Sequence, residues 1–237
     1  MIAILRTDLR RVVRDRFMLG LVGMALGLAV AVRFALPAVA GEVESFDLEV
    51  YFPLFVSYMV VCVAALMAGA VGGFLLLESR EEATLRALVV TPVPLQTYLA
   101  VMGGALAVFT AILALGQSVV IGLALPPWPA ILGCALCGAA FAPGIALFLA
   151  TFASNKVEAF AVMKILGVVN MVVLGAWFLP EPLQWLCGFY PPYLVCKAWW
   201  TAGAGGSSWP LWLFASLPIT VLYLWLLGRR FLRVATR

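Results

Sequence analysis

The sequence predicts an all-α membrane protein with six transmembrane helices. Three observations predict this class: the composition, the length of the apolar segments, and the placement of the basic residues. Of the 237 residues, 65% are hydrophobic and only 11% are charged, whereas a soluble domain carries roughly 25% charged residues. We therefore interpret the chain as a series of membrane spans, each of the roughly 20 residues that cross a bilayer's hydrocarbon core, and not as one or two soluble domains.

Six apolar segments are long enough to cross a bilayer, and together they form a single transmembrane domain over residues 1–237. The predicted spans are 17–36, 51–77, 98–125, 130–153, 157–178 and 209–228. Prolines and aromatic residues interrupt a further apolar segment, 180–206, which favours extracytoplasmic re-entrant or interfacial helices over a straight span. Residues 1–16 alternate apolar residues with arginines at helical spacing, so we expect an amphipathic interfacial helix there.

The lysines and arginines predict the orientation of the spans. The N-terminal segment, the C-terminal tail and the 78–97 loop all carry arginines, while the 37–50 loop carries acids and no basic residue. Basic loops stay on the cytoplasmic side, so both termini and the 78–97 loop are expected in the cytoplasm. Two termini on one side require an even number of spans, which favours six over five or seven.

The polar segment between the second and third spans, ESREEATLRALVVTPVPLQTY (78–98), carries the strongest functional signal. Ser79 and Glu82 have the spacing of a capping box at a helix start. Glu82 and Arg86 form an i, i+4 pair, and Thr91-Pro92 would end the helix. The pattern predicts a short amphipathic helix over 79–90 at the cytoplasmic surface, joined to two spans, although an ordinary solvated loop fits the same residues. Its apolar face would consist of Leu85, Leu88 and Val89.

This segment resembles the coupling region of ABC-2 type permeases, the membrane halves of ATP-binding-cassette exporters. In that family the second span is followed by the pattern E-x-x-x-G-T-L-x-x-L-x-x-T-P with further acids. Ala83 stands where many members have glycine, and Arg80 lies among the acids. The matching residues are Glu78, Glu81, Glu82, Ala83, Thr84, Leu85, Leu88, Thr91 and Pro92.

Two further regions extend the resemblance over the whole chain. Residues 178–200 are similar to the proline-rich region before the last span of that family, and residues 1–16 match its connecting helix. Small drug-efflux permeases, including fluoroquinolone exporters, are the most similar group. The resemblance implies a dimer of permease chains, identical or different, in a bacterial cytoplasmic membrane. It also implies a separate ATPase subunit that binds ATP and Mg²⁺, and a hydrophobic or amphipathic substrate such as a drug or lipid.

Several absences agree with a permease subunit that is not itself an enzyme. The chain has no histidine and no G-x-x-x-x-G-K-[ST] loop, so we expect no nucleotide site, cofactor or metal in it. The basic residues form no stripe for nucleic acid. Permeases for haem-pathway, lipid or polysaccharide export remain alternatives on the same architecture. A secondary transporter and an intramembrane enzyme acting on lipid are less favoured, because no inverted repeat is evident and few groups within the spans could act as acid or base.

Polar residues inside the spans are candidates for the substrate path: Gln117 in the third span, and Asn170 and Lys164 in the fifth. Gln117 and Asn170 suit interhelical hydrogen bonds equally well. Lys164 could instead snorkel to the surface or pair with Glu158. Two G-x-x-x-G pairs, beginning at Gly23 and Gly69, would permit close helix packing. Among the cysteines, Cys134 and Cys137 suit packing in a helix, and Cys187 and Cys196 could form a disulfide.

Overall fold

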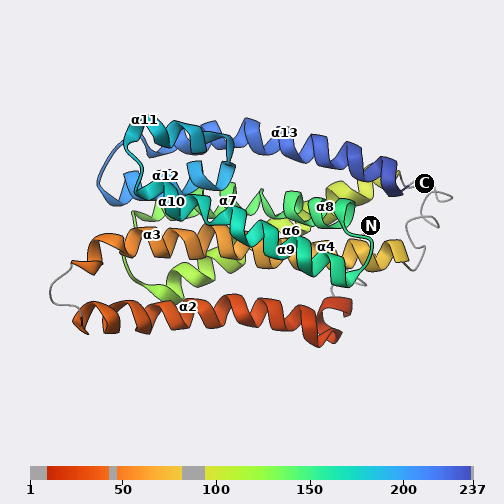
Figure 1. Cartoon of the computed structure of the whole chain (residues 1–237), viewed down its shortest axis with the longest axis horizontal. Coiled ribbons are helices and arrows are strands. Elements are labelled where there is room, and N and C mark those ends of the chain that lie inside the picture. The colour runs from red at the N-terminus through yellow and green to blue at the C-terminus, as the bar shows by residue number, and fades with distance from the viewer. Residues whose placement is uncertain (1–9, 43–46, 82–93, 236–237) are drawn as a thin grey trace.

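A computed structural model of the chain describes residues 10–42, 47–81 and 94–235. Within these ranges every regular element is helical, and six helices are long and apolar enough to cross a membrane. The long helices run roughly along one axis, and the two ends of the chain lie at the same end of the bundle (Figure 1). We call this the termini end. The protein is therefore a multi-pass all-α membrane protein, as the composition predicts.

Each predicted span overlaps one long helix or helix pair. The spans are α2 (Arg16–Glu42); a continuous run of η1 (Leu48–Tyr51), α3 (Phe52–Ser57), η2 (Tyr58–Val63) and α4 (Ala64–Glu81); α6 (Leu95–Ile121); α7 (Trp128–Ala139) with α8 (Ala142–Phe152); α9 (Lys156–Asn170) with α10 (Val172–Trp177); and α13 (Trp209–Ala235). The third span ends four residues before the predicted 125, because Gly122 adopts a left-handed conformation (φ +62°) that caps the helix.

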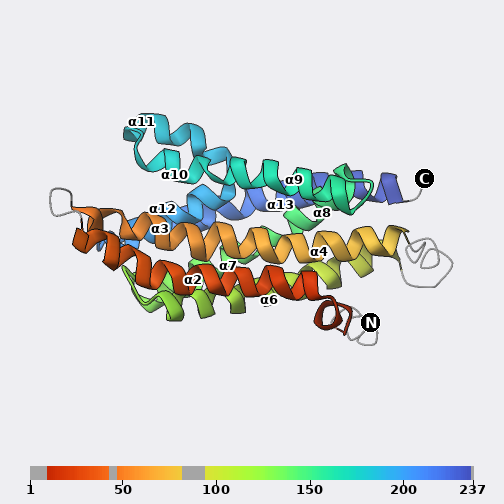
Figure 2. The same ribbon diagram turned by 60° about the horizontal axis from the view of Figure 1, so that its bottom comes forward.

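The second span forms the centre of the bundle. Its most apolar stretch is completely buried in the protein, as expected for a helix that is apolar on all sides. In Figure 2, α3 and α4 run between α2 and α6 on one side and α9 and α13 on the other. Gly69 and Gly73 allow α4 to pack closely on α8: a Cβ on Gly69 would lie 2.6 Å from the Cβ of Ile145. A Cβ on Gly23 or Gly27, in the other G-x-x-x-G pair, would meet no atom within 4 Å, so that pair makes no such contact among the described residues.

Residues 178–208 form a helical hairpin at the end of the bundle opposite the termini. It consists of α11 (Glu181–Gln184), η3 (Trp185–Phe189) and α12 (Pro191–Gly203). The Tyr190 hydroxyl donates a hydrogen bond to Asn170, and its ring packs on Phe141 in the middle of the fourth span. From there α12, 13 residues long, runs back to the end it came from (Figure 1). At 1.5 Å per residue it is about 20 Å long, too short to cross a roughly 30 Å hydrocarbon core.

The core of this hairpin is held by specific contacts to the second and fourth spans. The Trp200 indole N–H donates to the Ser57 hydroxyl at 2.7 Å. Cys134 is fully buried and its thiol donates to the Val195 carbonyl at 3.6 Å, so it acts as a packing residue. Cys187 and Cys196 are both free thiols in this structure.

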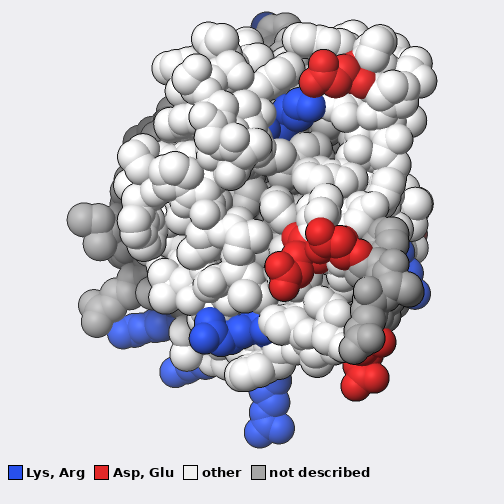
Figure 3. All heavy atoms as spheres, turned by 90° about the vertical axis from the view of Figure 1, so that its left-hand side faces the viewer, with Lys and Arg blue, Asp and Glu red and all other residues white. Residues whose placement is uncertain are grey.

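Arg33 of α2 caps the C-terminal end of the third span, at the end of the bundle opposite the termini. Its Nη1 donates to the carbonyl oxygens of Val120 and Ile121 at 2.9 and 3.2 Å, the last turn of α6. A cation at a helix C-terminus satisfies carbonyls that have no partner in the helix and suits the helix dipole. Figure 3 looks onto this end and shows acidic groups amid a mainly uncharged surface, with most of the visible basic groups along the lower rim.

Candidate functional site

A charged cavity of about 490 Å³ opens at the termini end, where three parts of the chain meet. They are the helical turn of residues 10–14 with Asp15, the end of α4 and the start of α9. We call it the basal cavity. Both basic and acidic side chains line it: Arg11, Arg14, Asp15, Glu78, Glu81 and Lys156. Two of these residues, Glu78 and Glu81, belong to the segment that resembles the coupling region.

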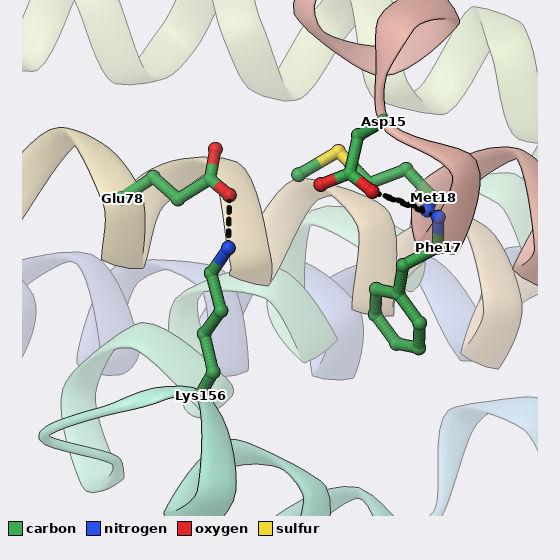
Figure 4. A network of polar contacts seen from close by, with 5 residues as sticks. All are labelled: Asp15, Phe17, Met18, Glu78 and Lys156. Carbon is green, nitrogen blue, oxygen red and sulfur yellow. Dashed lines mark hydrogen bonds and ion pairs between the residues drawn. The ribbon is translucent and has the colours of Figure 1, made fainter.

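An ion pair joins the second and fifth spans across this cavity. The Lys156 ammonium lies 2.6 Å from a Glu78 carboxylate oxygen, and the two side chains are 49% and 18% exposed. Figure 4 shows Lys156 reaching up from the start of α9 to Glu78 on α4. A partly exposed pair of this kind contributes about 0–1 kcal/mol to folding. The pair connects the base of the second span to the base of the fifth.

Asp15 fixes the corner between the N-terminal helical turn and the first span. Its carboxylate accepts hydrogen bonds from the backbone N–H groups of Phe17 and Met18 at 2.8 and 3.4 Å (Figure 4). These are the second and third residues of α2, so Asp15 is the N-cap of that helix. Helix ends at Arg14 and begins again at Arg16, which redirects the chain into the bundle.

An aromatic cluster supports the basal cavity. Phe17 of α2, Phe74 of α4 and Phe160 of α9 pack with ring centroids 5.0–5.4 Å apart. Aromatic pairs at such distances stabilise by about 0.5–1.5 kcal/mol beyond their buried area. The first, second and fifth spans are thus joined next to the charged residues.

The predicted coupling residues divide into three groups in the structure. Glu78 and Glu81 line the basal cavity, whereas Arg80 points to the fourth span and donates to the carbonyls of Ala150 and Ala153. The predicted helix start at Ser79 is wrong: Ser79 is buried inside α4, which continues to Glu81, so it cannot cap a new helix. The remaining predicted residues lie outside the described part of the chain: Glu82, Thr84, Leu85, Leu88, Thr91 and Pro92.

The three candidates for the substrate path differ in exposure. Gln117 is completely buried, and its amide donates to the Ala25 carbonyl of α2 at 2.8 Å. Asn170 is 2% exposed and accepts from Tyr190. Both therefore join separate elements within the chain, and neither side chain is exposed. Lys164 is exposed on α9, and among the described residues it has no hydrogen-bonding or ionic partner.

The expected alternative partner of Lys164 is engaged elsewhere. The Glu158 carboxylate accepts the backbone N–H of Ser154 at 2.7 Å, while the Asn155 side chain accepts the Glu158 N–H at 2.9 Å. This reciprocal arrangement starts α9 after the tight turn that follows α8. It leaves Lys164 alone on an apolar face that also carries exposed Ile165 and Val168.

Sequence reasoning missed four residues of the basal cavity: Arg11, Arg14, Asp15 and Lys156. Two local signals point to the elements that carry them. An aspartate between arginines at the boundary of the first apolar run is a typical N-cap, and N-K-V-E at 155–158 has capping-box spacing. No local signal, however, brings the bases of the first, second and fifth spans together.

Exchanging the charges of the ion pair tests its role. We expect Glu78→Lys and Lys156→Glu each to lower transport several-fold, because each places two like charges at the same point of the basal cavity. The double exchange restores the opposite charges and should recover most of the activity. Transport measured in membrane vesicles, normalised to the amount of protein, gives the three values. Equal loss in the double variant would contradict a positioning role for the pair.

Fold and site together define a multi-pass all-α membrane protein whose termini end carries a charged cavity at the bases of three spans. Comparison with known proteins makes this specific. The family described as "Fluoroquinolones export permease protein Rv2686c-like" matches residues 8–228. The chain belongs to this family of ABC-2 type export permeases.

Two relatives come from Mycobacterium tuberculosis, and each is 28% identical over 234 residues. They are the fluoroquinolones export permease proteins Rv2686c of strain H37Rv and MT2760 of strain CDC 1551. The alignment covers 95% of this chain and 91% of each relative. The resemblance seen in residues 78–92 and 178–200 is thus confirmed at the level of the family.

Proposed function

We propose that the chain is the membrane subunit of an ABC exporter, which docks a separate ATPase at its termini end and moves an amphipathic drug-like substrate. The basal cavity carries this proposal. Its mixed charges lie at the bases of three spans and include Glu78 and Glu81 of the segment that resembles the coupling region. Such a surface suits a soluble partner, because complementary charges set the register and specificity of docking. ATP and Mg²⁺ would be held by that partner, not by this chain.

The distribution of charge supports a cytoplasmic location for this end. Arginines of the N-terminal turn and of the last turns of α13 gather at the termini end, while Glu42, Asp47 and Glu49 lie at the other end. By the positive-inside rule this distribution favours a cytoplasmic location for both termini, on the side of a bacterial membrane where an ATPase would find ATP.

Charge reversal at Glu81 and Glu82 tests the docking surface. In inside-out vesicles that contain the chain and its ATPase, we expect Glu81→Lys/Glu82→Lys to reduce ATP-driven fluoroquinolone uptake at least tenfold. ATP hydrolysis should no longer respond to substrate, and the protein should still insert. Asp47→Lys/Glu49→Lys changes the same charge at the opposite end and is the matched control. Normal uptake by the double reversal, or uptake driven by an ion gradient without ATP, would refute the proposal.

Lys164 supports a substrate path along the exposed face of the fifth span. It lies eight residues into α9, about 12 Å along the helix axis. A charge at such depth costs at least about 2.5 kcal/mol when it faces lipid, so these residues normally face protein or water. A second permease chain facing α9 would enclose Lys164 at the path. There its ammonium would suit the carboxylate of an amphipathic substrate.

Replacing Lys164 by methionine separates this role from snorkelling to the membrane surface. If Lys164 faces the path, Lys164→Met should raise the KM for a carboxylate-bearing fluoroquinolone about tenfold, which corresponds to the loss of about 1.4 kcal/mol. The KM for its carboxyl ester should change little. If the side chain only snorkels through lipid, both KM values stay the same, because methionine is at least as compatible with acyl chains.

A further inference from the structure

A second cavity of about 780 Å³ lies between α6, α8 and α13, on the side of the bundle away from the basal cavity's residues. Small residues such as Gly103, Gly104 and Gly228 line it together with larger apolar ones such as Leu147 and Trp225. We call it the α6–α13 groove. It is partly open to the surroundings, and its volume lies within the range of about 300–1,000 Å³ that is usual for small-molecule sites.

The groove has the length of one leaflet. On α6 it extends from Gln96 to Ala107, which is about 16 Å along the helix axis. This is about half of a roughly 30 Å hydrocarbon core. Gln96 follows the first residue of α6, and Leu232 lies near the end of α13. The groove therefore starts at the termini end and stops near the middle of the bundle.

The guanidinium of Arg229 lines the groove at the termini end. Arg229 is exposed, and its guanidinium carbon lies 3.8 Å from the centroid of the Trp225 ring. Stacking occupies the flat face of the guanidinium and leaves the N–H groups at its edge able to donate. In the ranges 10–42, 47–81 and 94–235, no acid forms an ion pair with Arg229. Such a held guanidinium suits an anion with several oxygens, a phosphate above all.

We propose that the α6–α13 groove binds an anionic phospholipid from the leaflet at the termini end. An acyl chain would lie along the small residues of α6, and the phosphate would accept hydrogen bonds from Arg229. Basic pockets between transmembrane helices at this level are typical sites for acidic lipid headgroups. Free phosphate would leave the apolar length of the groove unused. This site is independent of the ATPase and of the exported substrate, and the bound lipid would join the third, fourth and sixth spans.

Native mass spectrometry of the purified full-length chain tests the proposal with two lipids of identical acyl chains, phosphatidylglycerol and phosphatidylcholine. The unmodified chain should bind phosphatidylglycerol about tenfold more tightly. Arg229→Gln should remove that preference. Gly104→Leu should weaken both lipids about tenfold, because a Cβ at Gly104 meets no protein atom within 4 Å and the side chain would fill the groove instead.

Two control variants are measured in the same way, and two other possible occupants of the groove, inorganic phosphate and a second copy of the chain, are tested. Arg230→Gln makes the same charge change at a residue that stacks on Phe152, and Gly116→Leu adds the same side chain to α6 in open space. Both should bind lipid like the unmodified chain. Equal binding of the two lipids by the unmodified chain would overturn the proposal. So would displacement of phosphatidylglycerol by millimolar inorganic phosphate, or loss of a dimer mass in Gly104→Leu, which would assign the groove to a second copy.

Discussion

Gly69→Leu is expected to abolish the accumulation of folded protein. A Cβ at this position would lie 2.6 Å from the Cβ of Ile145 and 2.8 Å from the carbonyl oxygen of Ala142. The second contact is with backbone, so no side-chain rotation relieves it. Overpacking a well-packed core costs about 1–3 kcal/mol and occasionally more. Because α4 is enclosed on all sides and α8 is its main neighbour, the two helices would have to separate along their whole length.

Fluorescence-detected size-exclusion chromatography of tagged variants measures this effect as the fraction of monodisperse protein. Gly23→Leu is the matched control, since it makes the same change in a G-x-x-x-G pair where no atom of residues 10–42, 47–81 or 94–235 lies within 4 Å of the new Cβ. Gly69→Ala should fall between the two. A Gly69→Leu profile equal to that of Gly23→Leu would show that α4 and α8 do not cross as closely as described.

These two glycine pairs show what sequence could and could not predict of the fold. Hydropathy predicted all six spans, since apolar length is a property of the local sequence. Gly23 and Gly69 have the same local pattern, but only the face of α4 with Gly69 meets another helix of the chain. Which face of an apolar helix is covered depends on the arrangement of all six spans. The π-helical turn of η2 (Tyr58–Val63) likewise has no local signal among apolar residues.

The candidate site was predictable in part for the same reason. Glu78 and Glu81 stand out because acids directly after an apolar span are costly inside a membrane. Ser79 was misread, because a capping-box spacing does not reveal whether the preceding helix has already ended. Lys156 became part of the site only through its contact with Glu78, which lies 78 positions earlier in the chain. Contacts of that range come from the packing of the spans.

Arg80 is expected to act on the stability of the bundle more than on the docking of an ATPase. Its Nη1 and Nη2 donate to the carbonyl oxygens of Ala150 and Ala153 at 2.9 and 2.8 Å, at the C-terminal end of α8. Hydrogen bonds from a charged donor contribute about 1.5–3 kcal/mol each, and the freed carbonyls would have few other donors. For Arg80→Gln we expect a loss of about 2–3 kcal/mol in stability, which lowers Tm by about 5–10 °C in a chain of this size.

Arg80→Lys distinguishes the geometry of the guanidinium from its charge. Lysine keeps the charge but cannot donate to two carbonyls in the fixed fork of arginine, so we expect it to recover less than half of the lost Tm. Arg233→Gln, an exposed basic residue in the last turn of α13, is the control and should change stability by less than about 0.5 kcal/mol. If Arg80 instead contacted the ATPase, Arg80→Gln would keep its Tm and lose substrate-stimulated ATP hydrolysis. We expect a lower Tm for Arg80→Gln because its two hydrogen bonds to α8 join the base of the second span to the end of the fourth. A push on residues 78–81 would then move both.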